Sequence, residues 1–448
     1  MASNGRMSIA VVGSGVSGLS AAWLLSSAHD VTLYEADARL GGHGNTIDAP
    51  TSRGKTPVDT GFIVYNENTY PNLTALLRHV GVATKASDMS FAVSIDDGAL
   101  EYAGTDLWGL FAQRSNLLRP RFCSMLRDLM RFYKEAPGDM AALGLDSLDD
   151  YLARKGFGAA FREDHLYPMA AAIWSTPSGR IGDYPAAAMI RFCENHGLLK
   201  ISDRPIWRTI EGGSRVYIEK LVAGVSGSVR VNAPVNRVTR GHDGAIVETA
   251  DGERRSYDHV VLASHADQSL AMLASADMDD KRILSAFRYG DNVAVLHADP
   301  ALMPRRRGAW ASWNYLARRG VSTAPPCVTY WMNNLQGIPA ETPLFVTLNP
   351  DREPSADLVI QRFDYAHPLF DARAIAAQEQ LWSLQGRGNV WFCGAYFGSG
   401  FHEDGLQAGL AVAEQLGGVR RPWSVANESG RIHVRPPLAA PRALEPTS

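Results

Sequence analysis

The sequence feature that most constrains the fold is a glycine pattern near the start of the chain. Gly13, Gly15 and Gly18 form G-x-G-x-x-G, between an apolar, β-branched run (9–12) and a helical run that ends at Leu25. In this pattern Gly13 suits a tight turn, Gly15 lets backbone approach a diphosphate, and Gly18 lets the helix pack closely on the strand. The helix N-terminus offers free N–H groups to an anion. The stretch therefore predicts a strand, a turn and a helix that bind a dinucleotide.

An acidic residue at a suitable distance strengthens this prediction. A second short strand, 30–35, ends in Glu35, which lies 22 positions (35 − 13) after Gly13. The usual spacing is about 20 residues, and such an acid accepts hydrogen bonds from a ribose diol. A chain with 41 glycines can produce the pattern by chance as a purely structural turn. The flanking strand, the helix and Glu35 favour dinucleotide binding.

Composition sets the class of protein. The chain has 448 residues, which predicts two domains, and its 46% hydrophobic and 20% charged residues are ordinary for a globular protein. A net charge of −3 argues against nucleic acid as a partner. No apolar run is long enough to span a membrane, and the polar start is unlike a signal peptide, so we expect a cytoplasmic protein. The four cysteines form no C-x-x-C pair, which predicts free thiols and no metal site: Cys123, Cys193, Cys327 and Cys393.

The C-terminal part repeats the strand–loop–helix arrangement. A strand at 390–392 is followed by a loop rich in glycine and aromatic residues and by a helix that begins near Asp404 or Gly405. Two helix N-termini at opposite ends of the chain are hard to explain with NAD alone. Extended FAD needs one set of contacts for its diphosphate and another for its isoalloxazine. The two units together predict FAD.

Several further elements can be placed from the pattern. We expect a strand over 58–64, a helix over 70–80, a hairpin at Asp97-Gly98, a helix over 215–223 and a short strand pair around Asn232 and Pro234. Aromatic-rich strands within 271–375 predict a second sheet. The stretch 107–133 is mostly helical and carries five arginines, either as a solvated face or as a surface for anionic lipid, at positions 114, 119, 121, 127 and 131.

These patterns predict an α/β fold with a discontinuous, Rossmann-like domain that binds FAD. We expect this domain to comprise residues 1–84, 205–270 and 376–430. A second α+β domain for the substrate, with an antiparallel sheet and helices, is expected at 85–204 and 271–375. The Pro- and Ala-rich end, 431–448, is predicted to be a flexible tail.

Several phrases of the sequence resemble those of a known superfamily. VVGSGVSGLSAAWLL, VTLYEA, RLGGH, VDTGF, EGGSRVYIEKL and FCGAYFGSGFHEDGLQAGLAVAE resemble the FAD-dependent amine oxidases and phytoene desaturases, with a GR2-type FAD domain. PMAAAIWSTP, YWMNNLQ and RFDYAHPLFD look more like bacterial FAD-binding oxidoreductases associated with cyclopropane fatty acid synthases. That group includes a desaturase of methylated fatty acyl chains. The resemblance implies FAD, which we expect to be bound non-covalently, and a functional association with a cyclopropane-fatty-acid-synthase-like methyltransferase.

The resemblance also implies roles for individual residues. The adenosine ribose would be held by Glu35 with Ala36, and the adenine by Val235. The remaining contacts would be Gly13, Ser14, Gly15, Val16, Ser17 and Gly18 at the diphosphate, Arg39, Gly42 and His43 along the ribityl–diphosphate stretch, Thr60, Gly61, Phe62 and Ile63 near the flavin ring, and Gly394, His402, Asp404, Gly405 and Leu406 at the ribityl and pyrimidine end.

The sequence departs from the superfamily at two points. Many members have an acid after the glycine that corresponds to Gly394, where this chain has Ala395. Glu403, Asp404 or a backbone group would then bind the ribityl chain. The paired aromatic cage of amine oxidases has no obvious equivalent, and its candidates are Tyr396, Phe397 and Phe401.

We therefore expect hydride transfer between a lipid acyl chain and the flavin, as in a fatty acyl desaturase. The catalytic candidates are Tyr65, His402 and Glu403. Glu403 would be the base, with its pKa raised by an apolar pocket, and His402 would orient the flavin or relay the proton. Both could instead cap the helix that follows. An amine oxidase and a non-catalytic lipid-binding flavoprotein are the alternatives. The electron acceptor is open, covalent flavin attachment at His43 or Cys393 is conceivable, and we expect peripheral membrane contact.

Overall fold

The computed structural model describes residues 5–144, 146–200, 204–321 and 323–435. These residues form two compact units, each treated separately below. Unit 1 comprises the described residues of Met1–Gly42, Leu221–Ala286 and Ala376–Ser448, and unit 2 comprises those of His43–Lys220 and Phe287–Ile375. Segments 43–84 and 205–220, which the sequence assigned to the FAD domain, fall in unit 2. Segment 271–286, assigned to the substrate domain, falls in unit 1.

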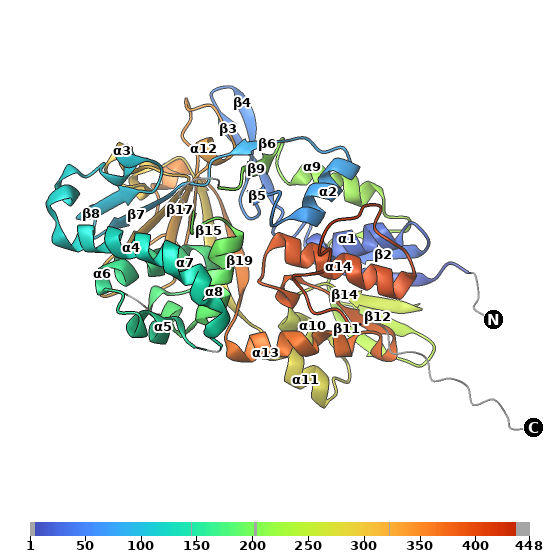
Figure 1. The fold of residues 1–448 in the computed structure, drawn as a ribbon. Coiled ribbons are helices and arrows are strands. Elements are labelled where there is room, and N and C mark those ends of the chain that lie inside the picture. Colours follow the sequence, from blue (N-terminus) through green and yellow to red (C-terminus); the bar gives the residue numbers. More distant parts are fainter. Residues whose placement is uncertain (1–4, 145, 201–203, 322, 436–448) are drawn as a thin grey trace, which may run out of the picture. The chain divides into compact units, whose positions relative to one another are not determined.

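Unit 1 is built on a parallel sheet (Figure 1). Its five strands are, in spatial order, β10 (Val229–Arg230), β2 (Asp30–Tyr34), β1 (Ser8–Val12), β14 (His259–Leu262) and β20 (Val390–Phe392). Every neighbouring pair runs parallel. The central strand β1 is buried from Ile9 onwards, as its β-branched sequence predicts. This sheet confirms the α/β fold class and places the glycine turn at the carboxyl end of the central strand, where α/β sheets bind ligands.

Two helices of unit 1 pack directly on each other (Figure 1). They are α1 (Val16–Leu25), which follows the glycine turn, and α14 (His402–Gly417), which begins at His402, slightly before the predicted start. A Cβ at Gly409 would lie 2.1 Å from the Ser17 carbonyl oxygen, so glycine is what permits this approach. The other regular elements are the antiparallel strands β11 (Val235–Arg240), β12 (Ala245–Thr249) and β13 (Arg254–Tyr257) and the helices α10 (Ala266–Met272), α11 (Met278–Leu284) and α13 (Ala372–Leu381), whose start lies in unit 2.

Unit 2 contains a seven-stranded sheet whose order is β19-β15-β18-β17-β16-β7-β8. The strands are β7 (Phe91–Ile95), β8 (Leu100–Ala103), β15 (Arg288–His297), β16 (Trp313–Ala317), β17 (Cys327–Trp331), β18 (Phe345–Leu348) and β19 (Val359–Leu369). All pairs are antiparallel except β7 with β16. Two smaller sheets combine β3 (Thr46–Thr51) with β4 (Gly54–Asp59), and β5 (Tyr65–Asn66) with β9 (Trp207–Ile210) and β6 (Thr84–Ser87). The predicted second sheet and the hairpin at Asp97-Gly98 are confirmed.

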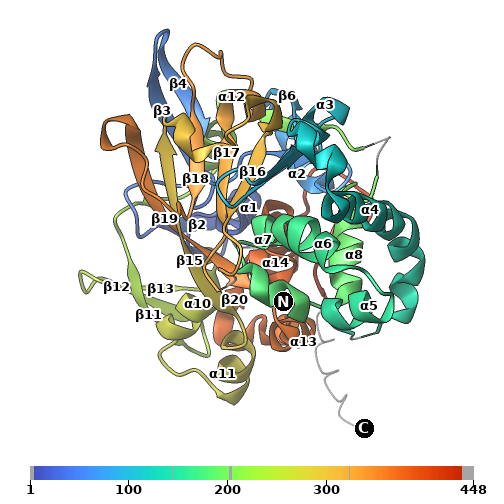
Figure 2. The same cartoon turned by 90° about the vertical axis from the view of Figure 1, so that its left-hand side faces the viewer.

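Helices cover one face of this sheet (Figure 2). Phe122, Phe132 and Met189 from the helices share one apolar core with Val93 and Val328 from the strands. The helices of unit 2 are α2 (Pro71–His79), α3 (Leu107–Leu110), α4 (Pro120–Asp139), α5 (Leu148–Arg154), α6 (Ala159–Phe161), α7 (Tyr167–Trp174), α8 (Ala186–Asn195), α9 (Arg215–Ala223), which runs on into unit 1, and α12 (Met332–Leu335). Among the described residues, none of the helices combines the length and the apolar character needed to cross a membrane.

Two predicted elements were wrong. The strand expected over 58–64 ends at Asp59, because Gly61 lies against His43: a Cβ at Gly61 would be 2.3 Å from the His43 carbonyl oxygen. The strands expected to pair around Asn232 do not pair, since β10 instead joins the parallel sheet beside β2. Both errors concern contacts with segments remote in sequence.

Candidate functional site

The glycine turn of unit 1 contains two glycines that the fold itself requires. Gly13 has φ +102°, and its N–H donates to the Tyr34 carbonyl oxygen at 2.8 Å. A Cβ there would lie 2.9 Å from the Ala263 carbonyl oxygen, and a Cβ at Gly18 would lie 1.9 Å from the Gly13 carbonyl oxygen. Packing alone therefore explains these two positions.

Gly15 is different, because packing does not require it. It adopts φ −61° and ψ 174°, which any residue can adopt, and a Cβ there would meet no atom within 4 Å. The open space lies at the N-terminus of α1, where N–H groups have no partner within the helix. A Cβ at Gly42 would lie 3.1 Å from Gly15 Cα, so the loop at Gly41–Gly42 closes one side of this space. The turn forms a cradle that the diphosphate of FAD fits.

Glu35 lies at the side of this cradle. Its carboxylate accepts hydrogen bonds from the backbone N–H of Ser14 at 2.9 Å and of Asp37 at 3.0 Å. The Glu35 carbonyl oxygen accepts from the Ala233 N–H at 2.9 Å. That bond holds the segment leading to Val235 beside Glu35. The two residues assigned to the ribose and the adenine are therefore anchored close together in unit 1.

The N-termini of α1 and α14 lie side by side. A Cβ at Gly405 would lie 2.9 Å from both Ser17 Oγ and Val16 Cγ1. Each helix N-terminus carries about half a positive charge, so the two together favour a bound anion. The sequence predicted both termini, and the structure adds that they are adjacent.

Asp404 is engaged within the protein. It is fully buried, accepts from the Phe401 N–H at 2.7 Å and forms an ion pair with Arg431 through its Oδ1. The Arg431 N–H also donates to Gln407 Oε1 at 3.1 Å. Asp404 is thus the third residue of α14, and its side chain binds back to the N-cap residue Phe401. It also anchors the first residues of the stretch predicted to be a flexible tail, of which 436–448 lie outside the described residues.

The two catalytic candidates at the start of α14 are both buried. Burial lowers the pKa of His402 to about 3, so its imidazole is neutral at physiological pH. A neutral imidazole with such a pKa can orient a neighbour by hydrogen bonding but is a very weak proton acceptor. The Glu403 carboxylate is fully buried and accepts from Gln407 Nε2 at 2.9 Å. Of the two, only Glu403 suits a role as base.

Two of the three aromatic candidates for an amine cage, Tyr396 and Phe397, pack against each other. The ring centroids of Tyr396 and Phe397 are 5.0 Å apart with an angle of 46° between their planes, and Phe397 meets Trp382 edge to face at 6.0 Å. The Tyr396 ring also covers Gly394, where a Cβ would lie 2.4 Å from Cε1. Rings this close leave no space between them for an amine.

In unit 2, the residues assigned to the flavin meet a tyrosine that the sequence analysis did not identify. Tyr365 OH lies 2.8 Å from Thr60 Oγ1 and accepts from Asn45 Nδ2 at 2.9 Å. Its ring stacks on the His43 imidazole, with centroids 5.0 Å apart. The His43 carbonyl oxygen accepts from the Phe62 N–H at 2.7 Å, which sets the path of the 60–63 loop.

A second missed residue lies next to the first. His367 follows Tyr365 by two positions in β19, and its ring lies 5.3 Å from that of His43. Its Nδ1 is within 3.2 Å of Asn292 Nδ2 and of Ser175 Oγ. A sequence signal was available, because both residues lie in RFDYAHPLFD, one of the phrases that carry the family resemblance. Their i, i+2 spacing in a strand places them on one face.

Asp59 joins three distant segments of unit 2. Its carboxylate accepts from the Ser214 N–H at 2.9 Å, from Thr46 Oγ1 at 2.6 Å and from Gln336 Nε2 at 3.1 Å. Burial raises the pKa of Asp59 to about 6 despite these bonds. Asp59 thus fixes the strand that leads directly into the predicted flavin loop at Thr60.

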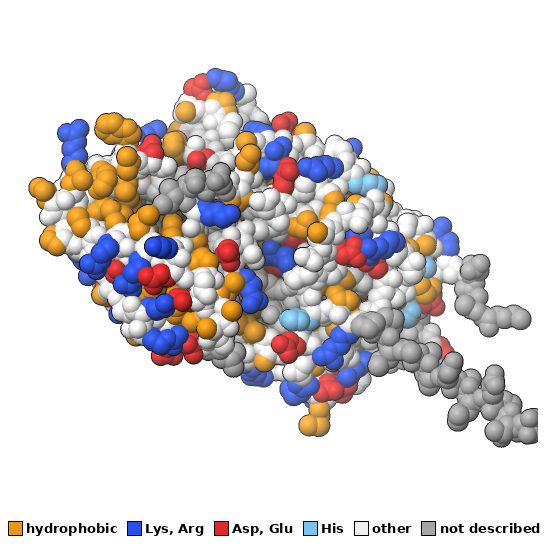
Figure 3. Space-filling model, viewed as in Figure 1, with side chains coloured by type: hydrophobic (Ala, Val, Ile, Leu, Met, Phe, Trp, Pro, Cys, Tyr) orange, Lys and Arg blue, Asp and Glu red, His pale blue; other side chains and the backbone are white. Residues whose placement is uncertain are grey.

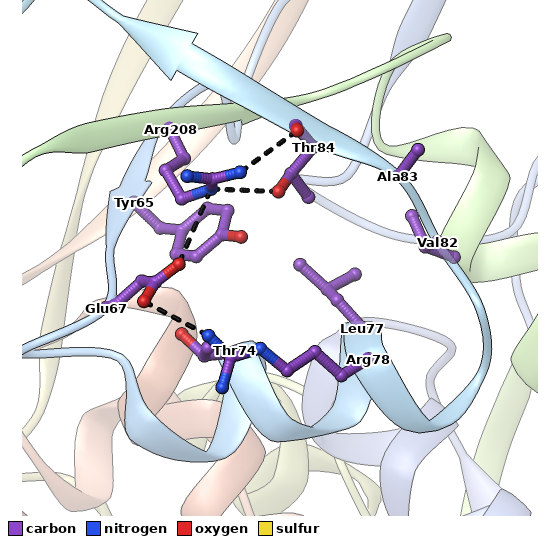
Figure 4. A pocket seen from close by; sticks show the side chains of 9 residues that line it. All are labelled: Tyr65, Glu67, Thr74, Leu77, Arg78, Val82, Ala83, Thr84 and Arg208. Carbon is purple, nitrogen blue, oxygen red and sulfur yellow. Dashed lines mark hydrogen bonds and ion pairs between the residues drawn. The ribbon is translucent and has the colours of Figure 1, made fainter.

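Tyr65, the third catalytic candidate, lines a pocket of about 300 Å³ in unit 2 (Figure 4). Glu67 forms ion pairs there with Arg78 at 3.1 Å and Arg208 at 3.6 Å. The apolar part of the wall comes from Leu77, Val82 and Ala83. With two arginines and one glutamate, this pocket carries a net positive charge. The structure describes no cluster of metal-ligating side chains among the residues it covers.

Comparison with known proteins identifies the family. The model of the family "Flavin containing amine oxidoreductase" matches residues 16–297, so the chain belongs to this family. It is an FAD-dependent oxidoreductase, and the cradle of unit 1 fits that cofactor. No curated protein matches the sequence.

Solved structures of similar fold include enzymes of different specificity. Putrescine oxidase bound to putrescine has a TM-score of 0.66 at 16% identity, with 92% of this chain and 99% of that chain covered. Cyclohexylamine oxidase from Brevibacterium oxydans IH-35A has 0.64 at 16%, with 92% and 100% covered. A CLA-producing fatty acid isomerase from P. acnes has 0.62 at 17%, with 91% and 97% covered. At these identities the likeness shows the fold alone.

Proposed function

We propose that this oxidoreductase dehydrogenates the acyl chain of a lipid, a methylated or unsaturated fatty acyl group of a phospholipid, as a desaturase does. The observation that carries the proposal is the charge of the Tyr65 pocket, in which Arg78 and Arg208 flank a single Glu67. A cationic pocket with apolar walls suits the anionic end of a lipid. It would repel the ammonium groups of a polyamine.

The packing of the aromatic residues after Gly394 supports the same choice. Tyr396 and Phe397 are buried against each other, and Phe397 also packs against Trp382. An amine cage needs two rings that face each other across the substrate, and these two instead fill the core of unit 1. A lipid substrate does not need such a pair of facing aromatic rings.

The chain's own residues would then handle one proton. Desaturation removes a hydride from one acyl carbon and a proton from its neighbour, and bound FAD supplies the hydride acceptor. Glu403 is the proposed base, because its carboxylate is fully buried at the start of α14. His402, neutral at working pH, would orient rather than relay. Tyr365 would hold Thr60 and Asn45 in place beside the predicted flavin loop.

This function places the chain after an enzyme that alkylates acyl chains. The double bond of a methylated, mono-unsaturated chain activates its allylic C–H bonds, and for such a substrate we expect functional association with a cyclopropane-fatty-acid-synthase-like methyltransferase. The electrons removed from the acyl chain would finally pass to an acceptor that is not part of this protein.

The test is anaerobic reduction of the purified flavoprotein. Phospholipid with methylated, mono-unsaturated acyl chains should bleach the visible flavin absorbance, and mass spectrometry should show acyl chains that have lost a hydrogen pair. The same measurement is repeated with three other compounds: saturated phospholipid, putrescine and cyclohexylamine. Bleaching by an amine and not by the lipid would assign amine oxidase activity instead. A colourless protein that binds lipid would indicate the non-catalytic alternative.

The base is tested with a matched pair of variants. Glu403→Gln keeps the acceptor for Gln407 and removes the carboxylate, so we expect flavin reduction by lipid to slow by about 100-fold or more with FAD content unchanged. Glu379→Gln, at an exposed position of α13, should leave the rate unchanged. Equal rates in the two variants would remove Glu403 from the mechanism.

A further inference from the structure

Four large apolar side chains of unit 2 are exposed within twelve residues of sequence. Their exposed fractions are 73% for Leu107, 84% for Trp108, 57% for Leu117 and 88% for Leu118. They lie on α3 and on the 3₁₀ helix η1 (Arg114–Leu118), which are joined by only three residues. Figure 3 shows hydrophobic side chains gathered over the part of unit 2 in which Figure 1 places α3. A cluster of this kind on a folded protein marks an interaction surface.

Arginines surround this apolar cluster. The segments 104–120 and 304–308 together carry five arginines and one aspartate: Arg114, Arg119, Arg305, Arg306, Arg307 and Asp106. Arg306 is paired with the buried Glu101 at 2.8 Å. For Arg114 and Arg305 no ion pair with a carboxylate is found among the described residues.

Printed contacts place the two segments on one surface. Arg119 donates to the carbonyl oxygen of Ala99, and Arg306 donates to that of Gly98 at 2.9 Å, so both guanidinium groups attach to the same β7–β8 turn. The 3₁₀ helix η6 (Arg307–Ala309) contacts α3. A Cβ at Gly308 would lie 3.4 Å from Ala112 Cβ, between α3 and η1. The arginines therefore border the exposed leucines and Trp108.

The arginines of α4 itself do not contribute to this surface. Arg121 pairs with Asp164 at 2.7 Å, Arg127 with Asp128 at 3.4 Å, and the Arg131 guanidinium lies 4.0 Å from the Phe157 ring centroid. For α4 the structure therefore favours the solvated face over the lipid-facing surface, and Arg114 and Arg305, which lack such a pair among the described residues, lie outside this helix.

We propose that Leu107, Trp108, Leu117 and Leu118, with Arg114, Arg119 and Arg305 around them, form a docking surface for a membrane that contains anionic lipid. The apolar side chains enter the headgroup–acyl boundary, where tryptophan is favoured, and the arginines bind lipid phosphates. The proposal does not depend on which substrate is oxidised.

The test is co-sedimentation of the full-length flavoprotein with vesicles. Wild type should bind vesicles of phosphatidylcholine with phosphatidylglycerol, bind pure phosphatidylcholine more weakly, and dissociate as salt is raised. Trp108→Ser with Leu118→Ser should lower binding by at least about tenfold. Arg114→Gln should lower it by roughly fivefold on the anionic vesicles alone.

Two matched variants control for general effects. Met278→Ser removes an equally exposed apolar side chain from unit 1, and Arg352→Gln removes an exposed arginine of unit 2 remote in sequence from the surface; both should bind as wild type does. FAD content reports folding in every variant. Unchanged vesicle binding by the Trp108/Leu118 variant, or no binding by wild type, would overturn the proposal. A dimer that this variant converts to monomer, without vesicle binding by wild type, would assign the surface to a second copy of the chain.

Discussion

The candidate site residues of unit 1 and those of unit 2 differ in kind, because the first form their site with backbone groups and the second with side chains. In unit 1, Gly13, Gly15 and Gly18 shape a cradle at the end of β1, beside the N-termini of α1 and α14. In unit 2, Asp59 and Tyr365 hold the loop predicted to lie near the flavin, through hydroxyl, amide and carboxylate groups that come from remote segments. A backbone site tolerates little change at its glycines. A side-chain site can be dismantled one hydrogen bond at a time.

The largest expected effect distinguishes Gly18, which packing requires, from Gly15, which packing does not require. Gly18→Val would place side-chain atoms on the Gly13 carbonyl oxygen, 1.9 Å from the ideal Cβ position, so we expect a loss of more than about 3 kcal/mol in unfolding free energy. Gly15→Ala meets open space and compatible φ and ψ. It should leave the stability of the apoprotein unchanged or raise it by up to about 1 kcal/mol.

The same Gly15→Ala variant should bind FAD at least about tenfold more weakly, because its methyl group occupies the cradle. Thermal unfolding without FAD and flavin titration measure the two effects separately. Full FAD affinity in a stable Gly15→Ala protein would show that the open space in front of α1 does not hold the diphosphate.

This contrast explains what the sequence could predict. The turn from Gly13 to Gly18 and the start of α14 are local patterns, in which spacing along the chain fixes the geometry, and both were found. The bonds between Thr60 and Tyr365 and between Asp59 and Gln336 join residues 305 and 277 positions apart. No spacing rule links such residues, so neither Tyr365 nor Asp59 was predicted. The strand expected over 58–64 failed for the same reason, since Gly61 packs against His43 outside any strand.

A smaller effect tests the side-chain network of unit 2. The pKa of Asp59 is raised from 3.8 to about 6 by burial, so the folded state holds its proton more tightly than the unfolded state does. The stability from this group is complete below about pH 4 and is lost as pH rises through 6. The free energy of unfolding of wild type, minus that of Asp59→Asn, should therefore fall by roughly 3 kcal/mol over this range. Urea titrations at saturating FAD measure the difference.

Asp48 provides the control of opposite sign. Its hydrogen bond with Arg215 lowers its pKa below 3.8, so its contribution is present above that value and is lost as pH falls further. The difference between wild type and Asp48→Asn should thus stay flat from about pH 5 to pH 7, where the difference for Asp59 still falls. A flat difference for Asp59→Asn as well would mean that the ionised carboxylate is not desolvated in the network of Thr46, Ser214 and Gln336.

The smallest expected effect concerns the side chain of His402 in unit 1, where the candidate site otherwise consists of backbone groups. Burial lowers the pKa of His402 from 6.5 to about 3, so the neutral form persists in the folded state while the unfolded state takes up a proton as pH falls below 6.5. The ratio of wild-type to His402→Asn turnover should therefore be constant between about pH 5 and pH 8. A change of this ratio near pH 6.5 would show that His402 carries a proton during turnover. Unit 1 would then contribute a side chain to the reaction as well as backbone groups. A constant ratio would exclude His402 as the proton acceptor. Glu403 would then be the remaining candidate base at the N-terminus of α14.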